Sequence, residues 1–477
     1  MKFKTNDFPR YARAAALNPE VRKVFTSATD RLIASREKAL NELGGIEPLR
    51  KAGQNIRRNG LEDLQGWLFK LEDSVTQAGG HVHHAMTAED ACKIIYNVLT
   101  KRGITRVVKS KSMTTLEIGL NDWLEQKGMN PLETDLGEYI IQLAGSPPSH
   151  IVGPAFHMTR SGVAQLFRKH HKESISDEPE KLAMAARIRL RQAFLEAEAG
   201  ITGVNFAASD TGTLVIVENE GNARMVSSLP KVHIAIMGID KVVPSIESVP
   251  TLLRLLVCSA TGQRMPSYVS FITGNGTKGE KKESDRELHL VLVDNGRSRI
   301  LADPDFREVL MCIRCGACLN ICPVYSVIGG HPYGFAYQGP IGAVLAPLIL
   351  GSRAAPSHPF ASTLCGACRE VCPVGIELPR MLVEHRSRMN DTRKKRRSPT
   401  GTRSERTMIR TAAWALDGTH QRRWFSKSAS RLLAMMSWGK RIKHLPYPFS
   451  RWTRFKDFPK PPRESFSVWW SKRLHRE

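Results

Sequence analysis

Seven of the nine cysteines lie close together in the C-terminal half of the chain, and their spacing could hold a metal cluster. Residues 312–323 read CIRCGACLNICP, the C-x2-C-x2-C-x3-C-P pattern of bacterial iron–sulfur proteins. A tight loop containing glycine can bring the thiolates of Cys312, Cys315 and Cys318 to three corners of one cubane, while Cys322 points toward a second cluster. Zinc, the alternative metal, usually binds two C-x-x-C knuckles or histidine. In a reducing compartment the pattern therefore predicts iron–sulfur chemistry rather than disulfides.

A second run, CGACREVCP at residues 365–373, matches the last three cysteines of the same pattern. The position that would complete it is occupied by Ser362. Crossed ligation of two [4Fe-4S] clusters gives a definite assignment: cluster 1 takes Cys312, Cys315, Cys318 and Cys372, and cluster 2 takes Cys322, Cys365 and Cys368. The fourth corner of cluster 2 would be filled by Ser362, another side chain, water or a partner. The alternatives are a three-iron [3Fe-4S] form and a chain with a single cluster.

The two cysteine runs are separated by 42 residues, more than the short hairpin of a small ferredoxin would need. The long insert predicts helices around the clusters. Because crossed ligands hold two clusters close together, the arrangement is that of an electron wire, whose potentials depend on hydrogen bonds to sulfur and on solvent access.

Upstream of the cysteines, several polar groups lie at the ends of predicted strands. Lys109, Lys111 and Ser112 could meet a carboxylate or phosphate, or could belong to a solvated loop. Residues 211–213 (TGT) and 219–222 (NEGN) could cradle an anion with their backbone donors, or could be ordinary turns.

Other polar pairs and thiols of this region have structural interpretations beside functional ones. His81 and His83 would share one face of a strand, and His84 follows them, but no acidic or cysteine partner for a metal lies nearby in sequence. Asp135 and Glu138 are a possible carboxylate pair or a pair at a helix N-terminus. The remaining two thiols, Cys92 and Cys258, lie in apolar helical segments and are predicted to be buried.

Four segments are predicted to position these residues. Residues 1–78 read as helical, with Leu61, Leu64, Leu68, Leu71 and Val75 on one helix face before Gly79-Gly80. In residues 79–297 short apolar runs alternate with helical segments, which predicts an α/β domain with a mostly parallel sheet. The strands are expected at 81–85, 106–110, 213–218, 231–238, 268–273 and 287–294, and helices at 88–102, 115–128 and 178–198. Residues 298–385 form the α-helical cysteine domain, and 386–477 a basic extension.

The net charge of +24 is concentrated in the tail. From Arg380 to the end there are 26 Lys and Arg against 7 Asp and Glu, and six of the eight Trp lie after residue 410. A basic linker precedes two possible helices, one with an apolar face opposite a basic one. The tail could be a solvated extension, could dock on a partner or an anionic membrane surface, or could bind nucleic acid, for which no motif is present.

No apolar run is long enough to cross a bilayer and no secretion signal is visible, so we expect a cytoplasmic protein, free or peripheral on the inner membrane.

Long sequence segments resemble a known family. Residues 109–125 (KSKSMTTLEIGLNDWLE), 134–155 (TDLGEYIIQLAGSPPSHIVGPA) and 202–244, together with CIRCGACLNICPVY, look like the lactate-utilisation iron–sulfur protein B family, and the likeness runs from about residue 10 to the closing SFSVWW. The resemblance implies a lactate-utilisation (LUD) domain, similar in fold to sugar-phosphate isomerases and CoA transferases, followed by a two-cluster α-helical ferredoxin domain. It also implies that the seven cysteines are the cluster ligands. No catalytic residue is carried over to the LUD domain.

Family members work with two sister proteins, of the A and C types, in oxidising L-lactate to pyruvate. The resemblance therefore implies an electron-transfer subunit that passes electrons toward a quinone or another carrier. One alternative is an enzyme that acts on an organic acid through the LUD pocket or an open-corner cluster. A second is a redox-sensing nucleic-acid binder. No G-x-G-x-x-G fingerprint stands out, so neither NAD nor flavin is predicted.

Overall fold

The computed structural model describes residues 5–171, 175–275, 286–395, 469–470 and 472–473. Residues 1–389 form one compact unit, which holds all nine cysteines and the candidate residues named above. Residues 390–477 are a second unit. The basic linker predicted after residue 385 is corrected in its first part, because residues up to 395 continue the helix α18 (Leu378–Lys395). The rest of the linker and the helices predicted in the basic extension lie outside the described residues.

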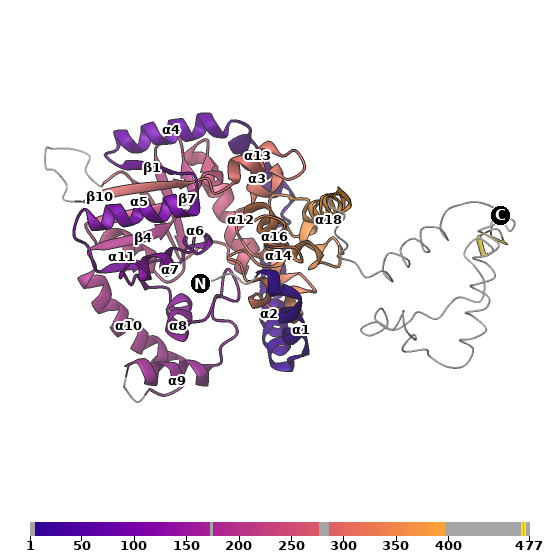
Figure 1. The fold of residues 1–477 in the computed structure, drawn as a ribbon, viewed down its shortest axis with the longest axis horizontal. Coiled ribbons are helices and arrows are strands. Elements are labelled where there is room, and N and C mark those ends of the chain that lie inside the picture. The colour runs from indigo at the N-terminus through magenta and orange to yellow at the C-terminus, as the bar shows by residue number, and fades with distance from the viewer. Residues whose placement is uncertain (1–4, 172–174, 276–285, 396–468, 471, 474–477) are drawn as a thin grey trace. The chain divides into compact units, whose positions relative to one another are not determined.

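A six-stranded sheet lies at the centre of the α/β domain, and all its neighbouring strands are parallel (Figure 1). The order is β1-β10-β7-β4-β2-β3. The strands are β1 (His81–Ala85), β2 (Val107–Lys109), β3 (Leu132–Glu133), β4 (Ala199–Gly203), β7 (Val232–Gly238) and β10 (Glu287–Val293). All seven residues of β7 are buried, as expected for a parallel strand covered on both faces. The predicted mostly parallel sheet is confirmed.

A smaller second sheet has the order β8-β5-β6-β9 and is mainly antiparallel. It consists of β5 (Phe206–Ala208), β6 (Thr213–Glu218), β8 (Val242–Val243) and β9 (Tyr268–Thr273). Two of the predicted strands, 213–218 and 268–273, therefore form but pair with each other outside the main sheet. The sequence did not indicate β4 or β5, because AGITG and FAA are short and lack the alternation or the run of β-branched residues that marks a strand.

Helices surround both sheets. They are α5 (Ala88–Thr100), α6 (Met113–Glu117), α7 (Leu120–Glu125), α8 (Leu136–Ala144), α9 (Arg160–His171), α10 (Pro179–Glu196), α11 (Asn222–Ser228) and α12 (Val249–Thr261). The single helix predicted over 115–128 is wrong. Gly119 has a φ of 67°, a left-handed conformation that interrupts the backbone hydrogen bonding and separates α6 from α7.

The N-terminal segment forms the helices α1 (Phe8–Leu17), α2 (Pro19–Glu42), α3 (Glu47–Glu62) and α4 (Leu64–Gln77), as predicted. The prediction that Leu61 through Val75 lie on one face of a single helix is wrong. Asp63 interrupts the helix between α3 and α4, and its carboxylate caps α4 by accepting a hydrogen bond from the Gly66 amide. Leu71 and Val75 are nevertheless fully buried. Gly79, with a φ of 82°, follows the end of α4.

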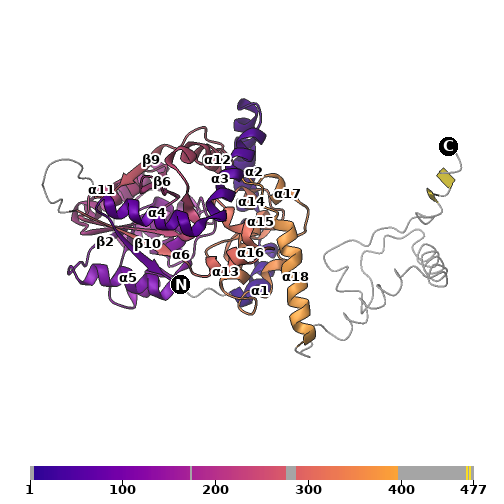
Figure 2. The same ribbon diagram turned by 90° about the horizontal axis from the view of Figure 1, so that it is seen from above.

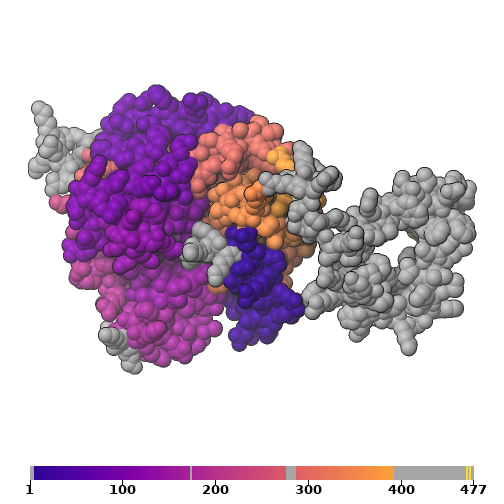
Figure 3. All heavy atoms as spheres, in the orientation of Figure 1, coloured from indigo at the N-terminus to yellow at the C-terminus, as the bar shows by residue number. Residues whose placement is uncertain are grey.

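The cysteine-bearing segment is built of short helices, as predicted, and the N-terminal helices pack on it (Figures 2 and 3). Its elements are α13 (Arg297–Ala302), η4 (Arg307–Met311), α14 (Ala317–Asn320), α15 (Tyr325–Ile328), η5 (His331–Tyr333), α16 (Gly339–Ile349), η6 (His358–Phe360), α17 (Ala367–Glu370) and α18 (Leu378–Lys395). Phe8 of α1 packs edge-on against Tyr333, with ring centroids 5.2 Å apart, and Phe25 of α2 packs against Tyr325 at 5.8 Å. One apolar core joins these helices to α12 and to the cysteines. None of the described helices is both long and apolar enough to span a bilayer.

Candidate metal centre

The two cysteine loops have the same local backbone geometry. In the first loop Arg314 has a φ of 62° and Gly316 a φ of 80°, and at the matching positions of the second loop Leu364 has a φ of 57° and Gly366 a φ of 89°. Each pair turns the chain so that a short helix, α14 or α17, begins directly after the glycine. Left-handed conformations are costly for residues other than glycine. Their recurrence at equivalent positions indicates that both loops are shaped for the same task.

Ser362 takes the place in the second loop that Cys312 takes in the first. The Arg314 amide donates to Cys312 Sγ at 3.4 Å, and the Leu364 amide donates to Ser362 Oγ at 3.1 Å. The serine hydroxyl therefore makes the same local contact as the cysteine sulfur two residues before the left-handed residue. The serine was noticed in the sequence only through the missing cysteine, and the structure adds this equivalence.

The cysteines gather in two groups that cross between the runs. Cys312, Cys315 and Cys318 share a small cavity with Cys372 of the second run, and Ile313, Ile341 and Val374 complete its apolar lining. Cys322 of the first run interacts electrostatically with Cys365 and Cys368 of the second. We call these the first and the second cysteine group. The assignment of these two groups as the ligands of two clusters stays a prediction.

Burial shapes the chemistry of these thiols. It raises the pKa of Cys318 well above its usual value, with the nearby cysteines adding to the effect, and it raises the pKa of Cys368 to about 12. Such thiols become thiolates when a metal takes the place of the proton. Soft sulfur donors suit iron–sulfur clusters and zinc. Within the described ranges no three His, Cys, Asp or Glu side chains converge closely enough to hold a single metal ion.

The two groups differ in their access to solvent. Cys315 and Cys372 are buried and Cys312 and Cys318 are half-buried, whereas Cys365 of the second group is exposed. Backbone amides donate hydrogen bonds to sulfur in both groups. In the first group, Ile376 N donates to Cys372 Sγ at 3.3 Å. In the second, burial raises the pKa of Cys322, and hydrogen bonds from the amides of Tyr325 and Val324 partly offset this rise. Hydrogen bonds to sulfur stabilise negative charge on a cluster.

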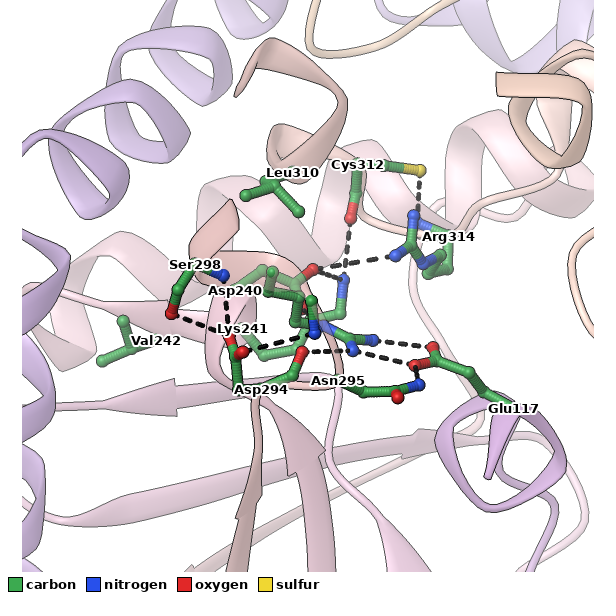
Figure 4. A network of polar contacts seen from close by, with 12 residues as sticks. Glu117, Asp240, Lys241, Val242, Asp294, Asn295, Ser298, Leu310, Cys312 and Arg314 are labelled. Carbon is green, nitrogen blue, oxygen red and sulfur yellow. Dashed lines mark hydrogen bonds and ion pairs between the residues drawn. The ribbon is translucent and has the colours of Figure 1, made fainter. Parts of the chain in front are cut away.

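A buried polar network connects the first cysteine group to the α/β domain (Figure 4). Arg297 donates to both carboxylate oxygens of Glu117, at 2.8 and 2.7 Å, and to Asp240 Oδ1 at 2.6 Å. Lys241 Nζ donates to the carbonyl oxygen of Cys312 at 2.8 Å and lies 2.9 Å from Asp240 Oδ2. Burial acts to raise the pKa of Glu117, but the Arg297 guanidinium outweighs it and holds that pKa below its usual value.

Arg57 of α3 completes the network from the N-terminal segment. Only 1% of its surface is exposed. Its guanidinium donates to the carbonyl oxygens of Met311 at 3.1 Å, Leu310 at 2.9 Å and Val242 at 3.2 Å, and also to that of Asp240. None of these charged residues was singled out in the sequence. The only available signal was the Asp-Lys pair at 240–241 amid apolar residues, because the partners lie 57 to 254 positions apart.

A polar cavity of about 330 Å³ lies between the strand ends and the first cysteine group. Its lining includes Lys111, Ser112 and Asp135, residues 219, 220 and 222 of the NEGN segment, and Arg314, Cys315 and Tyr337. Lys111 Nζ donates to the Val152 carbonyl oxygen at 2.8 Å, and burial together with Asp135 raises the pKa of Glu220 to about 7. The structure therefore brings the polar candidates from the Lys111, Asp135 and NEGN segments into one cavity. The same cavity is lined by Glu218, which the sequence analysis missed.

Three other candidates, Thr213, Lys109 and Glu138, are not part of the lining of this cavity. Thr213 belongs to β6 and shares a hydrogen bond of 2.8 Å with Thr273, so the TGT segment forms a turn and a strand start. Lys109 is not in a solvated loop: it is buried and lies 2.7 Å from Glu133. Asp135 accepts a hydrogen bond from the Glu138 amide and caps α8. Burial and Glu133 raise the pKa of Glu138 to about 8.

The histidines of β1 bond to neighbouring side chains. His83 Nε2 lies 3.0 Å from His289 Nδ1, and His84 Nε2 lies 3.0 Å from a Glu72 carboxylate oxygen. His81 stacks on the His289 ring at 4.9 Å. The expectation that Cys92 and Cys258 are buried is confirmed, with exposures of 0% and 1%.

Comparisons with known proteins match both halves of this unit. The LUD domain model matches residues 68–301, and the 4Fe-4S dicluster domain model matches residues 308–376. Lactate utilization protein B of Bacillus subtilis (strain 168) is 42% identical over 474 residues, covering 99% of this chain and 98% of its own. The chain belongs to the lactate utilization protein B family. The resemblance and the predicted fold class, a LUD domain followed by an iron–sulfur domain, are thereby confirmed.

Two further comparisons gave similar proteins. Lactate utilization protein B of Bacillus cereus (strain AH820) is 42% identical over 450 residues, which cover 94% of this chain and 93% of that one. A crystal structure of a DUF162 family protein from Deinococcus radiodurans matches 48% of this chain and 98% of its own, at 17% identity and a TM-score of 0.27. In this member of the lactate utilization protein B family, all seven clustered cysteines fall within the residues matched by the 4Fe-4S dicluster domain.

Proposed function

We propose that the chain is the iron–sulfur electron-transfer subunit of a complex that oxidises L-lactate to pyruvate. The observation that carries this proposal is the crossed gathering of seven cysteines into two adjacent groups. Clusters bound there would accept and release single electrons. The name of the similar proteins supports lactate as the substrate of the system. The partners would be the sister A- and C-type proteins, one of which oxidises lactate.

The first cysteine group would hold cluster 1 and the second group cluster 2. Cys312, Cys315, Cys318 and Cys372 supply four thiolates to the first, and Cys322, Cys365 and Cys368 supply three to the second. Ser362 is our candidate for the fourth ligand of cluster 2, because its hydroxyl occupies the position equivalent to the Cys312 sulfur. Without that ligand cluster 2 would be a [3Fe-4S] form.

The exposure of Cys365 favours the second group as the point where electrons cross to or from another protein. The first group is enclosed by apolar side chains and borders the polar cavity instead. The proposal includes an electron acceptor linked to quinone. It also includes docking of the basic extension on a sister subunit or on the inner face of the membrane.

The test is anaerobic purification of the full chain with iron and sulfide analysis, followed by lactate-dependent dye reduction. We expect about seven or eight irons per chain and dye reduction only when the sister proteins are added. A colourless, iron-free protein that still supports lactate oxidation in the complex would contradict the proposal.

The polar cavity favours a second candidate function, an enzyme that acts on an organic acid. Cys315 and Arg314 lie in its wall beside the carboxylates of Glu218 and Glu220, so a bound acid would meet both proton acceptors and the first cysteine group. Lactate-dependent dye reduction by the purified chain alone, reduced at least tenfold in Lys111→Ala, would favour this candidate. Activity that always requires the sister proteins would exclude it.

A further inference from the structure

The network between the LUD domain and the first cysteine group carries an excess of positive charge. Its cations are Arg57, Lys241, Arg297 and Arg314, and its anions are Glu117 and Asp240. All six side chains are at most 9% exposed. Asp294, at the edge, is half-buried, and its carboxylate accepts hydrogen bonds from Ser298 rather than from these cations. Two positive charges therefore have no carboxylate in the network.

Uncompensated charge in a protein interior is costly, and a nearby negative group is needed to offset it. The first cysteine group lies in the required place. Arg57, Lys241 and Arg314 all interact electrostatically with Cys312. Within the described part of the chain, Arg314 Nε and Nη1 are buried without a hydrogen-bond partner, and Arg314 lines the cavity that the four sulfurs share. Its guanidinium is fixed over the Tyr337 ring at 4.4 Å.

We propose that this network is the built-in counter-charge of cluster 1, so that buried charges from the N-terminal helix α3, the LUD domain and the first cysteine loop together set the reduction potential of that cluster. A four-iron cluster with four thiolates is doubly negative when oxidised and gains one further negative charge on reduction. Two buried positive charges balance the first state, and they favour the second because opposite charges attract strongly where water is excluded. The inference rests on the proposed function only in that cluster 1 is present.

In the described part of the chain, the second cysteine group has no buried cations comparable to these four; Arg386, which donates to the Ser362 carbonyl oxygen at 3.2 Å, is only half-buried. The side-chain charges that act on Cys322 and Cys368 are those of the other cysteines. Arg369 lies next to Cys368 in sequence, but it is exposed and paired with Glu377. The proposal therefore predicts that charge changes in the network move the potential of cluster 1 and leave that of cluster 2 in place.

Glu117 and Arg314 provide a test with opposite signs. The full chain is purified with its clusters under anaerobic conditions, and each midpoint potential is measured by redox titration followed by electron spin resonance. The signal of cluster 1 is the one that Cys318→Ser removes. We expect Arg314→Gln to lower the midpoint potential of cluster 1 and Glu117→Gln to raise it. Arg314→Lys, which keeps the charge, should stay near the unchanged protein.

Controls separate this electrostatic role from a structural one. Arg369→Gln removes an exposed arginine from the second loop and should leave the potential of cluster 1 unchanged. Iron content and melting temperature are measured for every variant, since a merely structural role would lower both and produce no opposite-signed shifts. If Arg314→Gln does not retain iron, Lys241→Gln replaces it. Lys241 belongs to the network and interacts electrostatically with Cys312, so the loss of its charge should also lower the midpoint potential of cluster 1.

Several results would overturn the proposal. The first is an unmoved midpoint potential of cluster 1 in Arg314→Gln, or in Lys241→Gln where that variant replaces it. The second is a shift of the same sign in Glu117→Gln and in the variant that removes a positive charge. The third is an equal shift of both clusters. Lactate-dependent dye reduction with the sister proteins is measured separately. Loss of that activity with the predicted shifts intact would reject the proposed function and leave the charge assignment standing.

Discussion

The first and second cysteine groups use the same loop twice in different surroundings. Left-handed residues, a following glycine and a short helix recur in both loops. The first group is enclosed, in contact with the LUD domain and surrounded by buried cations, whereas the second contains the exposed Cys365 and a serine where the first has Cys312. The local sequence thus determines how a loop can hold a cluster, and the distant parts of the chain determine which environment that cluster would meet.

The largest effect is expected from removing a sulfur of the enclosed group. Cys318→Ser should abolish cluster 1 and lower iron by about four atoms per chain, because metal binding and folding are coupled in such sites. Iron analysis and the melting temperature measure this. Unchanged iron would refute the assignment of Cys318. Cys365→Ser, in the exposed group, should disturb the fold less.

A smaller loss is expected from breaking the network on which the first group rests. Arg297→Gln would leave Glu117 and Asp240 without their main buried partner, and we expect it to lower the free energy of unfolding by about 3–5 kcal/mol. Denaturant unfolding of the anaerobic protein measures it. Arg264→Gln is the control, because its pair with Glu42 is exposed and should contribute less than about 1 kcal/mol. Equal effects of the two variants would contradict the importance of the buried network.

The two loop glycines test the comparison directly. An alanine at either position must adopt a left-handed conformation, at a cost of about 1–2 kcal/mol. At Gly316 the added Cβ would also lie 3.2 Å from Ile151, while at Gly366 it would meet nothing within 4 Å. We therefore expect Gly316→Ala to lower the unfolding free energy more than Gly366→Ala. The reverse order would show that the first loop is less tightly enclosed than described.

The mildest change should make the second loop more like the first. Ser362→Cys would place a sulfur where the serine hydroxyl now accepts the Leu364 amide, giving the second group four cysteines. We expect the low-temperature spin-resonance signal of cluster 2 to change and the stability to remain within about 0.5 kcal/mol. Thr363→Cys, one position along, is the matched control. A signal unaffected by Ser362→Cys would mean that residue 362 is not at the open corner.

Sequence reasoning was most successful where the pattern is local. The apolar runs at 232–238 and 287–293 predicted strands of a parallel sheet, which the structure contains, and the spacing of the cysteines predicted an iron–sulfur domain, which the family model matches. It failed where a single residue decides, as at Gly119, which divides a predicted helix, and Asp63, which begins a new one. Glu117 and Arg297 were missed because their partners are distant in the chain, and Asp240 was missed although it lies among apolar residues.

Arg57 has a consequence for dividing the molecule. Its guanidinium, from the N-terminal helices, satisfies carbonyl oxygens on both sides of the boundary between the two matched domains, at Val242 and at Leu310 and Met311. A fragment cut between residues 301 and 308 would leave this arginine with half of its acceptors. It would also expose to water the apolar surface that the two parts bury against each other. The first 389 residues should therefore melt in one transition, and neither part is expected to be a self-sufficient module.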